Sequence, residues 1–371
     1  MKVVLATAFR LFFLLAGVWS VVALGAWSWS LHASVALRAA AGGVAWHGHE
    51  LVWGFSMAVI GGFLLTAARA WTGRPTASGV GIAAIAALWL VDRVAGWTGG
   101  EAASILGAAF PMAVALAVGR PILAAKSWRN IGFIPLLGLL SALDLAAHLG
   151  WMPWSAASRV AVDAVVVVLA IVGGRIVPLF TRNAIQGAPV RQWAWLEWAS
   201  LAAVWAVVAV DLWAPWGRAS AFVAGVAGVL HLGRWLGWAG WWTRRSPILW
   251  VLHVGYAWIW IGFGLRAAVP YGVPASAALH ALTAGAIGTL ALGMMARVSL
   301  GHTGRPLVVK RPITGAFLVV TLAALLRVGL ALASETAHLA WAGALFCIAF
   351  TVFVAIYTPA LVSPRPDGRE G

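Results

Sequence analysis

The sequence has very little charge for its length. Asp, Glu, Lys and Arg make up 9% of its 371 residues, whereas 63% are hydrophobic. This composition excludes an ordinary soluble domain, whose surface is rich in charged side chains. Apolar runs of about 20 residues recur along the chain and are long enough to cross a bilayer, so we expect a polytopic membrane protein. The alternating pattern of a membrane barrel is absent, and the spans are therefore expected to be helices.

Cysteine is almost absent as well. The chain has one cysteine, Cys347, which excludes an intrachain disulfide and a thiolate metal site. No CxxCH motif occurs, so a covalently attached c-type haem is excluded too. A metal or haem bound by this chain is therefore expected to depend on histidine and oxygen ligands.

The apolar runs predict an all-α fold of about twelve transmembrane helices. We expect one integral membrane domain over residues 1–362 and a polar C-terminal tail over 363–371. The expected spans are 9–29, 49–70, 78–95, 101–119, 131–149, 156–180, 195–213, 218–240, 247–269, 275–298, 312–332 and 337–360.

The basic residues predict the orientation of these spans. If both termini are cytoplasmic, 19 of the 25 Lys and Arg residues lie on the cytoplasmic side and 6 on the other. Cytoplasmic loops carry such an excess of positive charge. The same bias explains the net charge of +15, and because the basic residues are spread over short loops, membrane lipid is the expected partner and nucleic acid is not.

One segment of the chain occurs twice, at a constant offset of 231 residues. His49 begins the first copy and His280 the second, and both copies end on the motif TGRP, which closes on Pro75 and Pro306. By the count of spans these copies are helices 2 and 10, which run in the same direction. The repeat predicts two equivalent helices that place a histidine at the same depth, where a metal or a haem could lie between them.

The first copy begins with WHGHE, which contains His47, His49 and Glu50. In an extended segment both histidines face one ion, but in a regular helix residues two apart point roughly 200° apart. In the helical case Glu50 shares a face with His47 and is expected to orient its ring. The alternative interpretation is a polar cap at the membrane interface.

His49 and His280 are the candidate ligands of a six-coordinate haem, since two neutral imidazoles at one level are what its iron needs. Glycines that follow each histidine would let a flat macrocycle approach, although they are equally expected if they only pack helices. Near the outer surface, Arg38 or Arg327 could meet the haem propionates.

Other ionisable residues within spans are candidates for a second site, because such residues are costly in lipid. His253 and His231 lie in the cytoplasmic half of their helices and could bind copper together or with His302, which is expected in a cytoplasmic loop. The alternative for each is a hydrogen bond to a carbonyl or a threonine. Asp144 and His148 share a helix face, where they could carry protons or bridge helices.

These motifs together resemble the NnrS family, over about residues 9–306. The stretches that carry the resemblance are FRLFFLLAG from Phe9, WHGHELVWGF from Trp46, GFLLTAARAWTGRP from Gly62, GGRIVPLFTRNA from Gly173, WVLHVGYAW from Trp250, ALHALTAGAIGT from Ala278 and RVSLGHTGRP from Arg297. The resemblance implies a multi-pass protein of the bacterial inner membrane that contains haem and copper. It also implies a link to denitrification and to nitric-oxide resistance. The histidines in these motifs are His47, His49, His253, His280 and His302.

The arrangement is also loosely similar to the main subunit of haem-copper oxidases, in which helices 2 and 10 supply the two histidines of a six-coordinate haem. The similarity stops at copper. Those oxidases place copper ligands in helices 6 and 7, and this chain has no histidine between residues 149 and 230. A copper ion would need a different set of ligands, with His47, His231, His253 and His302 as the candidates.

Two classes of function follow. In the first, the protein holds haem b and copper and binds or turns over nitric oxide, an uncharged gas that enters lipid. If it is an enzyme, it is an oxidoreductase with a quinol or a cytochrome as electron donor. In the second, it is a transporter, for which twelve helices with an internal repeat are typical. A haem-based electron carrier or sensor without turnover is a third possibility.

Overall fold

The computed structural model describes residues 3–35, 42–98, 100–336 and 338–368, and within these ranges it contains helices and no strand. Twelve helical segments are long and apolar enough to cross a membrane, which confirms the predicted fold class. Arg38, one of the two residues expected to meet haem propionates, lies outside the described residues, as does the end of the predicted C-terminal tail.

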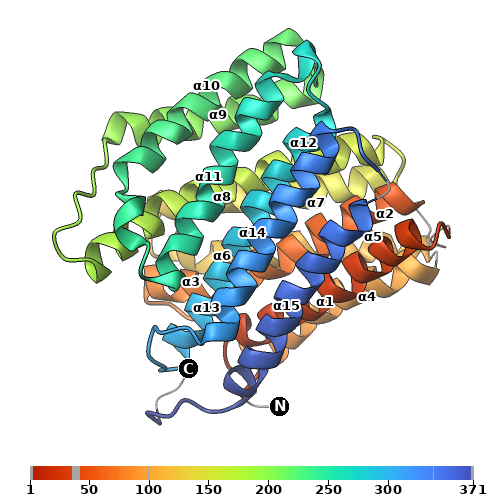
Figure 1. Ribbon diagram of the computed structural model, residues 1–371. Coiled ribbons are helices and arrows are strands. Elements are labelled where there is room, and N and C mark those ends of the chain that lie inside the picture. The colour runs from red at the N-terminus through yellow and green to blue at the C-terminus, as the bar shows by residue number, and fades with distance from the viewer. Residues whose placement is uncertain (1–2, 36–41, 99, 337, 369–371) are drawn as a thin grey trace. The chain divides into compact units, whose positions relative to one another are not determined.

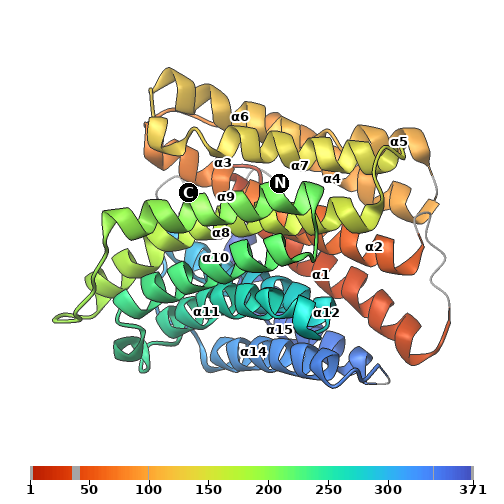
Figure 2. The same cartoon turned by 90° about the horizontal axis from the view of Figure 1, so that it is seen from above.

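The chain divides into two compact units, and the prediction of one membrane domain stays a prediction. Unit 1 consists of Met1–Ala161, Met295–Leu307 and Phe350–Gly371. The elements that lie within it are α1 (Ala8–His32), α2 (Gly43–His49), η1 (Glu50–Ser56), α3 (Met57–Thr72), α4 (Val80–Thr98), α5 (Glu101–Gly107), α6 (Phe110–Ala124), η2 (Trp128–Asn130) and α7 (Phe133–His148). In this unit α1 packs against α3, α4 against α5, and α6 against α7 (Figures 1 and 2).

Unit 2 consists of Val162–Met294 and Val308–Ala349. The elements that lie within it are α9 (Ala194–Trp213), α10 (Arg218–Gly237), η3 (Gly240–Thr243), α11 (Pro247–Ala267), η4 (Val269–Tyr271), α12 (Ala275–His280), η5 (Ala281–Gly288) and α14 (Arg311–Leu332). Here α10 packs against both α9 and α11 (Figure 1). Three further helices contribute residues to both units: α8 (Trp154–Ala184), α13 (Thr289–His302) and α15 (Leu339–Val362).

The repeated segment has the same local structure in both copies. His49 is the last residue of α2 and His280 the last residue of α12, and each is followed directly by a π-helix, η1 or η5. A π-helical turn shifts the side chains that follow it relative to a regular α-helix, and such turns are frequent at functional sites. The repeat is therefore a repeat of conformation, with a histidine at the start of an irregular turn each time.

The TGRP motif ends the long helix of each copy. Gly73 and Gly304 both have positive φ, of 65° and 69°, which is the left-handed conformation that favours glycine at a helix end. The hydroxyl of Thr72 donates to the Ala68 carbonyl at 2.6 Å, and the hydroxyl of Thr303 donates to the Ser299 carbonyl at 2.5 Å. The four-residue match thus encodes a helix stop.

Two expectations about element boundaries were wrong. The second span begins at Gly43 and not at residue 49, so WHGHE is helical and His47 and His49 do not lie in an extended segment. His302 is the last residue of α13 and not part of a loop, because the helix continues until the glycine stop at Gly304. Its ring lies 5.5 Å from that of Phe9.

Arg10 holds the start of α1 against the end of α15, in unit 1. It is 1% exposed, and its Nη1 donates to the carbonyls of Leu361 and Ser363 at 2.9 Å each and to that of Ala360 at 3.2 Å. The last carbonyls of a helix have no partner within the helix, and a guanidinium satisfies them here.

Replacing Arg10 by Ala is expected to lower the free energy of unfolding by roughly 1–3 kcal/mol, since it removes the donor from several buried carbonyls. Thermal unfolding in detergent measures the loss. Arg69→Ala, at an exposed arginine of the same unit, is the control and should unfold near the wild-type temperature. Equal behaviour of the two variants would contradict this role for Arg10.

Candidate metal centre

Four ionisable side chains meet inside unit 1, from three different membrane helices. His49 ends α2, Asp92 lies in α4, and Asp144 and His148 lie one turn apart in α7. His49, Asp92 and Asp144 are 4%, 3% and 1% exposed. The side chain of His148 is 13% exposed and is the most exposed of the four. We call these four residues the His–Asp cluster.

The possible ligand atoms of the His–Asp cluster lie close together. One ligand atom each from His49, Asp92 and His148 lies within 4.8 Å of the others. Nε2 of His49 lies 3.2 Å from Oδ1 of Asp144 and 3.5 Å from Oδ2 of Asp92. Nε2 of His148 lies 3.6 Å from Oδ1 of Asp144 and 3.9 Å from Oδ1 of Asp92. The spacing suits one ion bound between them.

These atoms also lack hydrogen bonds. Nε2 of His49, Nε2 of His148, Oδ1 of Asp92 and both carboxylate oxygens of Asp144 are buried without a hydrogen-bond partner among the described residues. A buried polar atom without a partner is rare, because its desolvation is not offset. Five such atoms pointing into one place indicate that something else occupies it.

The ring of His49 is held in the form that a metal ligand needs. Its Nδ1 lies 2.9 Å from Oε1 of Glu50. A carboxylate only accepts hydrogen bonds, so the proton of the neutral ring lies on Nδ1 and the lone pair on Nε2 faces the His–Asp cluster. Metal-binding histidines usually donate their second ring N–H to a carboxylate in this way. The contact joins the last residue of α2 to the first residue of the π-helix η1.

Glu50 and Asp92 are in turn held by one guanidinium. Nη1 of Arg93 donates to Oε2 of Glu50 at 2.6 Å, and Nη2 of Arg93 donates to Oδ2 of Asp92. Nε1 of Trp19 also donates to Oε2 of Glu50, at 2.8 Å. Asp92 therefore keeps Oδ1 for another partner, and Asp144 keeps both oxygens.

Formal charge gives an independent indication. The His–Asp cluster and its supports contain three carboxylates, on Glu50, Asp92 and Asp144, and one guanidinium, on Arg93. With neutral imidazoles the sum is two negative charges, buried in a helical bundle of membrane length. A net buried charge of this size is strongly unfavourable. A divalent cation between the four ligands brings the sum to zero.

Small residues let the supporting helices approach. A Cβ on Gly107 would collide with Asp92, and a Cβ on Gly54 would lie 2.5 Å from Nη1 of Arg93. Nε1 of Trp89 donates to the Gly54 carbonyl at 2.9 Å, so η1 and α4 are tied together at that point. The indole ring of Trp154 packs edge-on against both His49 and His148, with ring centroids 5.1 and 4.8 Å away.

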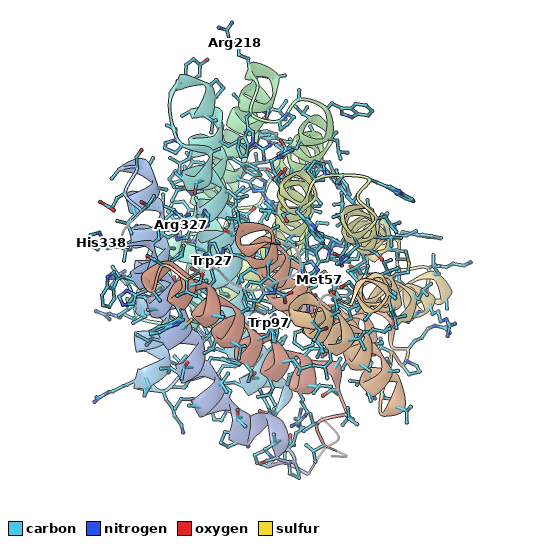
Figure 3. The ribbon with its side chains drawn as sticks, turned by 90° about the vertical axis from the view of Figure 1, so that its right-hand side faces the viewer. Trp27, Met57, Trp97, Arg218, Arg327 and His338 are labelled. Carbon is cyan, nitrogen blue, oxygen red and sulfur yellow. The ribbon has the colours of Figure 1, made fainter. Side chains whose placement is uncertain are left out.

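The other predicted ligands lie elsewhere. The ring of His47 is stacked on that of Trp27 (labelled in Figure 3), with centroids 5.1 Å apart, and the carboxylate that was expected to orient it contacts His49. His280 belongs to unit 2, and its Nδ1 lies 2.8 Å from the carbonyl of Ser276. The proton of the neutral ring is therefore on Nδ1 and the lone pair on Nε2. The pairing of His49 with His280 stays a prediction, because each is described within its own unit.

The two histidines of the expected second site are both in unit 2. Nδ1 of His231 lies 2.7 Å from the hydroxyl of Tyr256. The Thr181 hydroxyl donates to the carbonyl of Val177, so it accepts from Nε2 of His253 at 2.9 Å. The lone pair of the neutral His253 ring is therefore on Nδ1. His253 has the threonine contact of the alternative interpretation, whereas the contact of His231 is with a tyrosine hydroxyl. A copper site with His302, which belongs to unit 1, stays a prediction.

The contacts of His49 favour a metal ion over the iron of a haem. Nε2 of His49 faces carboxylate oxygens and the His148 ring packs against its ring, so a haem on His49 would have to displace these side chains. The glycines that were expected to make room are also covered: Gly54 by Trp19 and Arg93, Gly62 by Phe12 and Phe13, and Gly285 by Trp258. They pack helices, which was the alternative interpretation. Nδ1 of His280 lies 2.8 Å from the Ser276 carbonyl, and Arg327 (labelled in Figure 3) donates to the Ser276 hydroxyl at 2.9 Å.

Sequence reasoning did not bring the four residues of the His–Asp cluster together. Asp144 and His148 were noted as a pair on one face, but Asp92 was overlooked and Glu50 was given to the wrong histidine. A signal was present, because Asp92 and Arg93 stand together inside the apolar stretch LWLVDRVAGW. Two charges within a span indicate a functional site by default.

Comparison with known proteins agrees with the resemblance seen in the motifs. A family model described as NnrS protein matches residues 3–365, which is nearly the whole chain. None of the curated proteins searched matches it.

Replacing Glu50 by Gln is expected to weaken metal binding by about 10- to 100-fold, the usual effect of losing such a supporting carboxylate. Glutamine keeps the size of the side chain but can donate to Nδ1 of His49, which would turn the lone pair away from the cluster. Titration with a divalent metal measures the change, with Glu197→Gln in unit 2 as control. An unchanged affinity in Glu50→Gln would show that His49 is not a ligand.

Gly54→Ala tests the support from Arg93. The added Cβ would push Nη1 of Arg93 away from Glu50, so we expect metal content to fall although no ligand is changed. Gly61→Ala is the matched control, because its Cβ would meet its nearest atoms at 3.4 Å, an ordinary contact. Metal analysis of the purified variants is the measurement, and normal metal content in Gly54→Ala would contradict the role of Arg93.

Proposed function

The chain belongs to the NnrS family, and from that premise we propose that it is a membrane metalloprotein that binds or turns over nitric oxide. Membership in the family suggests a part in the response to nitric oxide. The observation that carries the proposal is the His–Asp cluster, in which five buried nitrogen and oxygen atoms that could bind a metal have no hydrogen-bond partner among the described residues. Nitric oxide is uncharged and dissolves in lipid, so a metal ion bound between membrane helices meets it there.

The residues of unit 1 supply what such a centre needs. His49, Asp92, Asp144 and His148 hold the ion, and Glu50 and Arg93 fix two of these ligands. Trp154 and Trp53 pack on His49 and exclude water from it. A dry site with oriented ligands favours binding of a small neutral molecule over a charged one.

Haem b and copper are the cofactors that the family resemblance implies. Imidazole nitrogens and carboxylate oxygens suit a divalent first-row ion, and Cu²⁺ is among these. His280 is the histidine that we propose for haem b, since its Nδ1 proton is directed to the Ser276 carbonyl. A bound haem or copper ion would supply redox chemistry, and the protein would supply ligands, orientation and a site without water.

The proposed place of the protein is the bacterial inner membrane, with both termini in the cytoplasm and a quinol or a cytochrome as the electron donor if turnover occurs. A carrier or sensor would share the metal but leave nitric oxide unconsumed. A nitric-oxide electrode on purified, reduced protein separates these roles, because only an enzyme removes the gas at a steady rate.

Binding of nitric oxide at the His–Asp cluster is tested with His148→Ala and Asp144→Asn. Both variants are expected to lose the change in spectrum that nitric oxide causes at this metal, while His253→Ala keeps it. The measurement is anaerobic titration with nitric oxide followed by absorption and EPR spectroscopy. A wild-type response in both cluster variants would refute the placement.

A further inference from the structure

We infer that the metal of the His–Asp cluster is a non-haem ferrous ion, held by two imidazoles and two carboxylates. The inference rests on the proposed function, because it names the ion through which the same site would receive nitric oxide. It goes beyond the copper and haem implied by the family resemblance. Three properties of the site lead to it: the charge it must neutralise, the chemical class of its ligands and the ligand it must accept.

The charge favours a divalent ion over a monovalent one. Glu50, Asp92, Asp144 and Arg93 leave two negative charges, and no further Lys or Arg is seen to contact the four ligands among the described residues. Cu⁺ would leave one negative charge buried, whereas Fe²⁺ leaves none. In the absence of metal, protons on the two imidazoles give the same neutral sum, so the ion is expected to displace protons as it binds.

The ligands are those of a hard or borderline ion. The four donors are nitrogen or carboxylate oxygen, and the one cysteine, Cys347, belongs to the other unit. Soft ions such as Cu⁺ select thiolates and thioethers. Two histidines with a carboxylate, and with coordination positions left open, are typical of non-haem Fe²⁺ sites.

The ion must also bind nitric oxide to serve the proposed function. Among first-row ions, Fe²⁺ and Cu⁺ bind this gas well, because each can donate electron density to it. The charge and the carboxylates disfavour Cu⁺, so Fe²⁺ is the ion that meets all three requirements. His148 and Asp144 supply their ligand atoms from one turn of α7, and His148 is the most exposed of the four residues. The gas is therefore expected to approach the ion from the side of His148.

The test uses the full-length protein, purified without oxygen and reconstituted in lipid nanodiscs. Total iron, copper, zinc and manganese are measured, and haem iron is determined separately by the pyridine haemochrome method. We expect iron in excess of haem, close to one ion per chain. We also expect nitric oxide to induce the high-spin EPR signal of a non-haem iron nitrosyl, which differs from the signal of a haem nitrosyl.

Asp144→Asn removes one ligand charge at constant size and is expected to lower the affinity for Fe²⁺ at least tenfold and to abolish that EPR signal. Asp163→Asn is the matched control. Asp163 is an equally buried aspartate of unit 2, but both of its oxygens accept from Arg266, at 3.0 and 3.1 Å, and it should keep metal and signal. If Asp144→Asn fails to fold, Fe²⁺ titration of chelator-treated wild-type protein, with proton release as a second readout, decides the same question.

The outcomes separate the two proposals. Copper, zinc or manganese at the cluster, with nitric oxide still bound there, would overturn the assignment of iron and leave the proposed function standing. A cluster that takes up no metal, or a nitric-oxide response that is independent of the cluster, would overturn both. Non-haem iron that is lost in Asp144→Asn and retained in Asp163→Asn supports both.

Discussion

Uncompensated negative charge among the helices of unit 1 is the constraint on which the rest of this site depends. Among the described residues no Lys or Arg forms an ion pair with Asp144, and Arg93 is shared between Glu50 and Asp92. Unit 2 deals with its buried aspartates differently, since Arg266 donates to both Asp163 and Asp211. The contrast matters because a carboxylate without a paired Lys or Arg among membrane helices marks a functional site by default. Two histidine Nε2 atoms at the same place favour a metal ion as the ligand that we propose there.

The repeated segment gains its meaning from conformation. In both copies a histidine ends a short α-helix, a π-helix follows, and a left-handed glycine ends the long helix beyond it. In unit 1 the carboxylate of Glu50 contacts the ring of His49, and in unit 2 the equivalent ring of His280 meets a backbone carbonyl. Both arrangements leave Nε2 unprotonated in the neutral ring. The two copies therefore fix the ring of a histidine in similar ways, with an anionic partner in one and a neutral partner in the other.

Much of the fold was readable from the sequence, because length and hydropathy decide where a helix can cross a bilayer. The twelve spans and the family were predicted in this way and are confirmed.

The site was only partly readable. His49 was found through the repeat, but its partners Asp92, Asp144 and His148 come from other helices, and spacing along the chain does not show which helices meet. The contact between the chain neighbours His49 and Glu50 was also hidden, because the rule for shared helix faces paired Glu50 with His47. The glycines after His49 fitted a macrocycle or a helix contact equally well, and only the side chains facing Gly54 and Gly62 decide for the second.

The most direct test of the account is an anomalous-diffraction map of the purified protein, recorded on both sides of the absorption edge of the metal that it carries. The account predicts one peak in unit 1, within ligand distance of Nε2 of His49, Nε2 of His148 and the carboxylates of Asp92 and Asp144. A map with no peak there, or with a haem iron bound to His49, would contradict it.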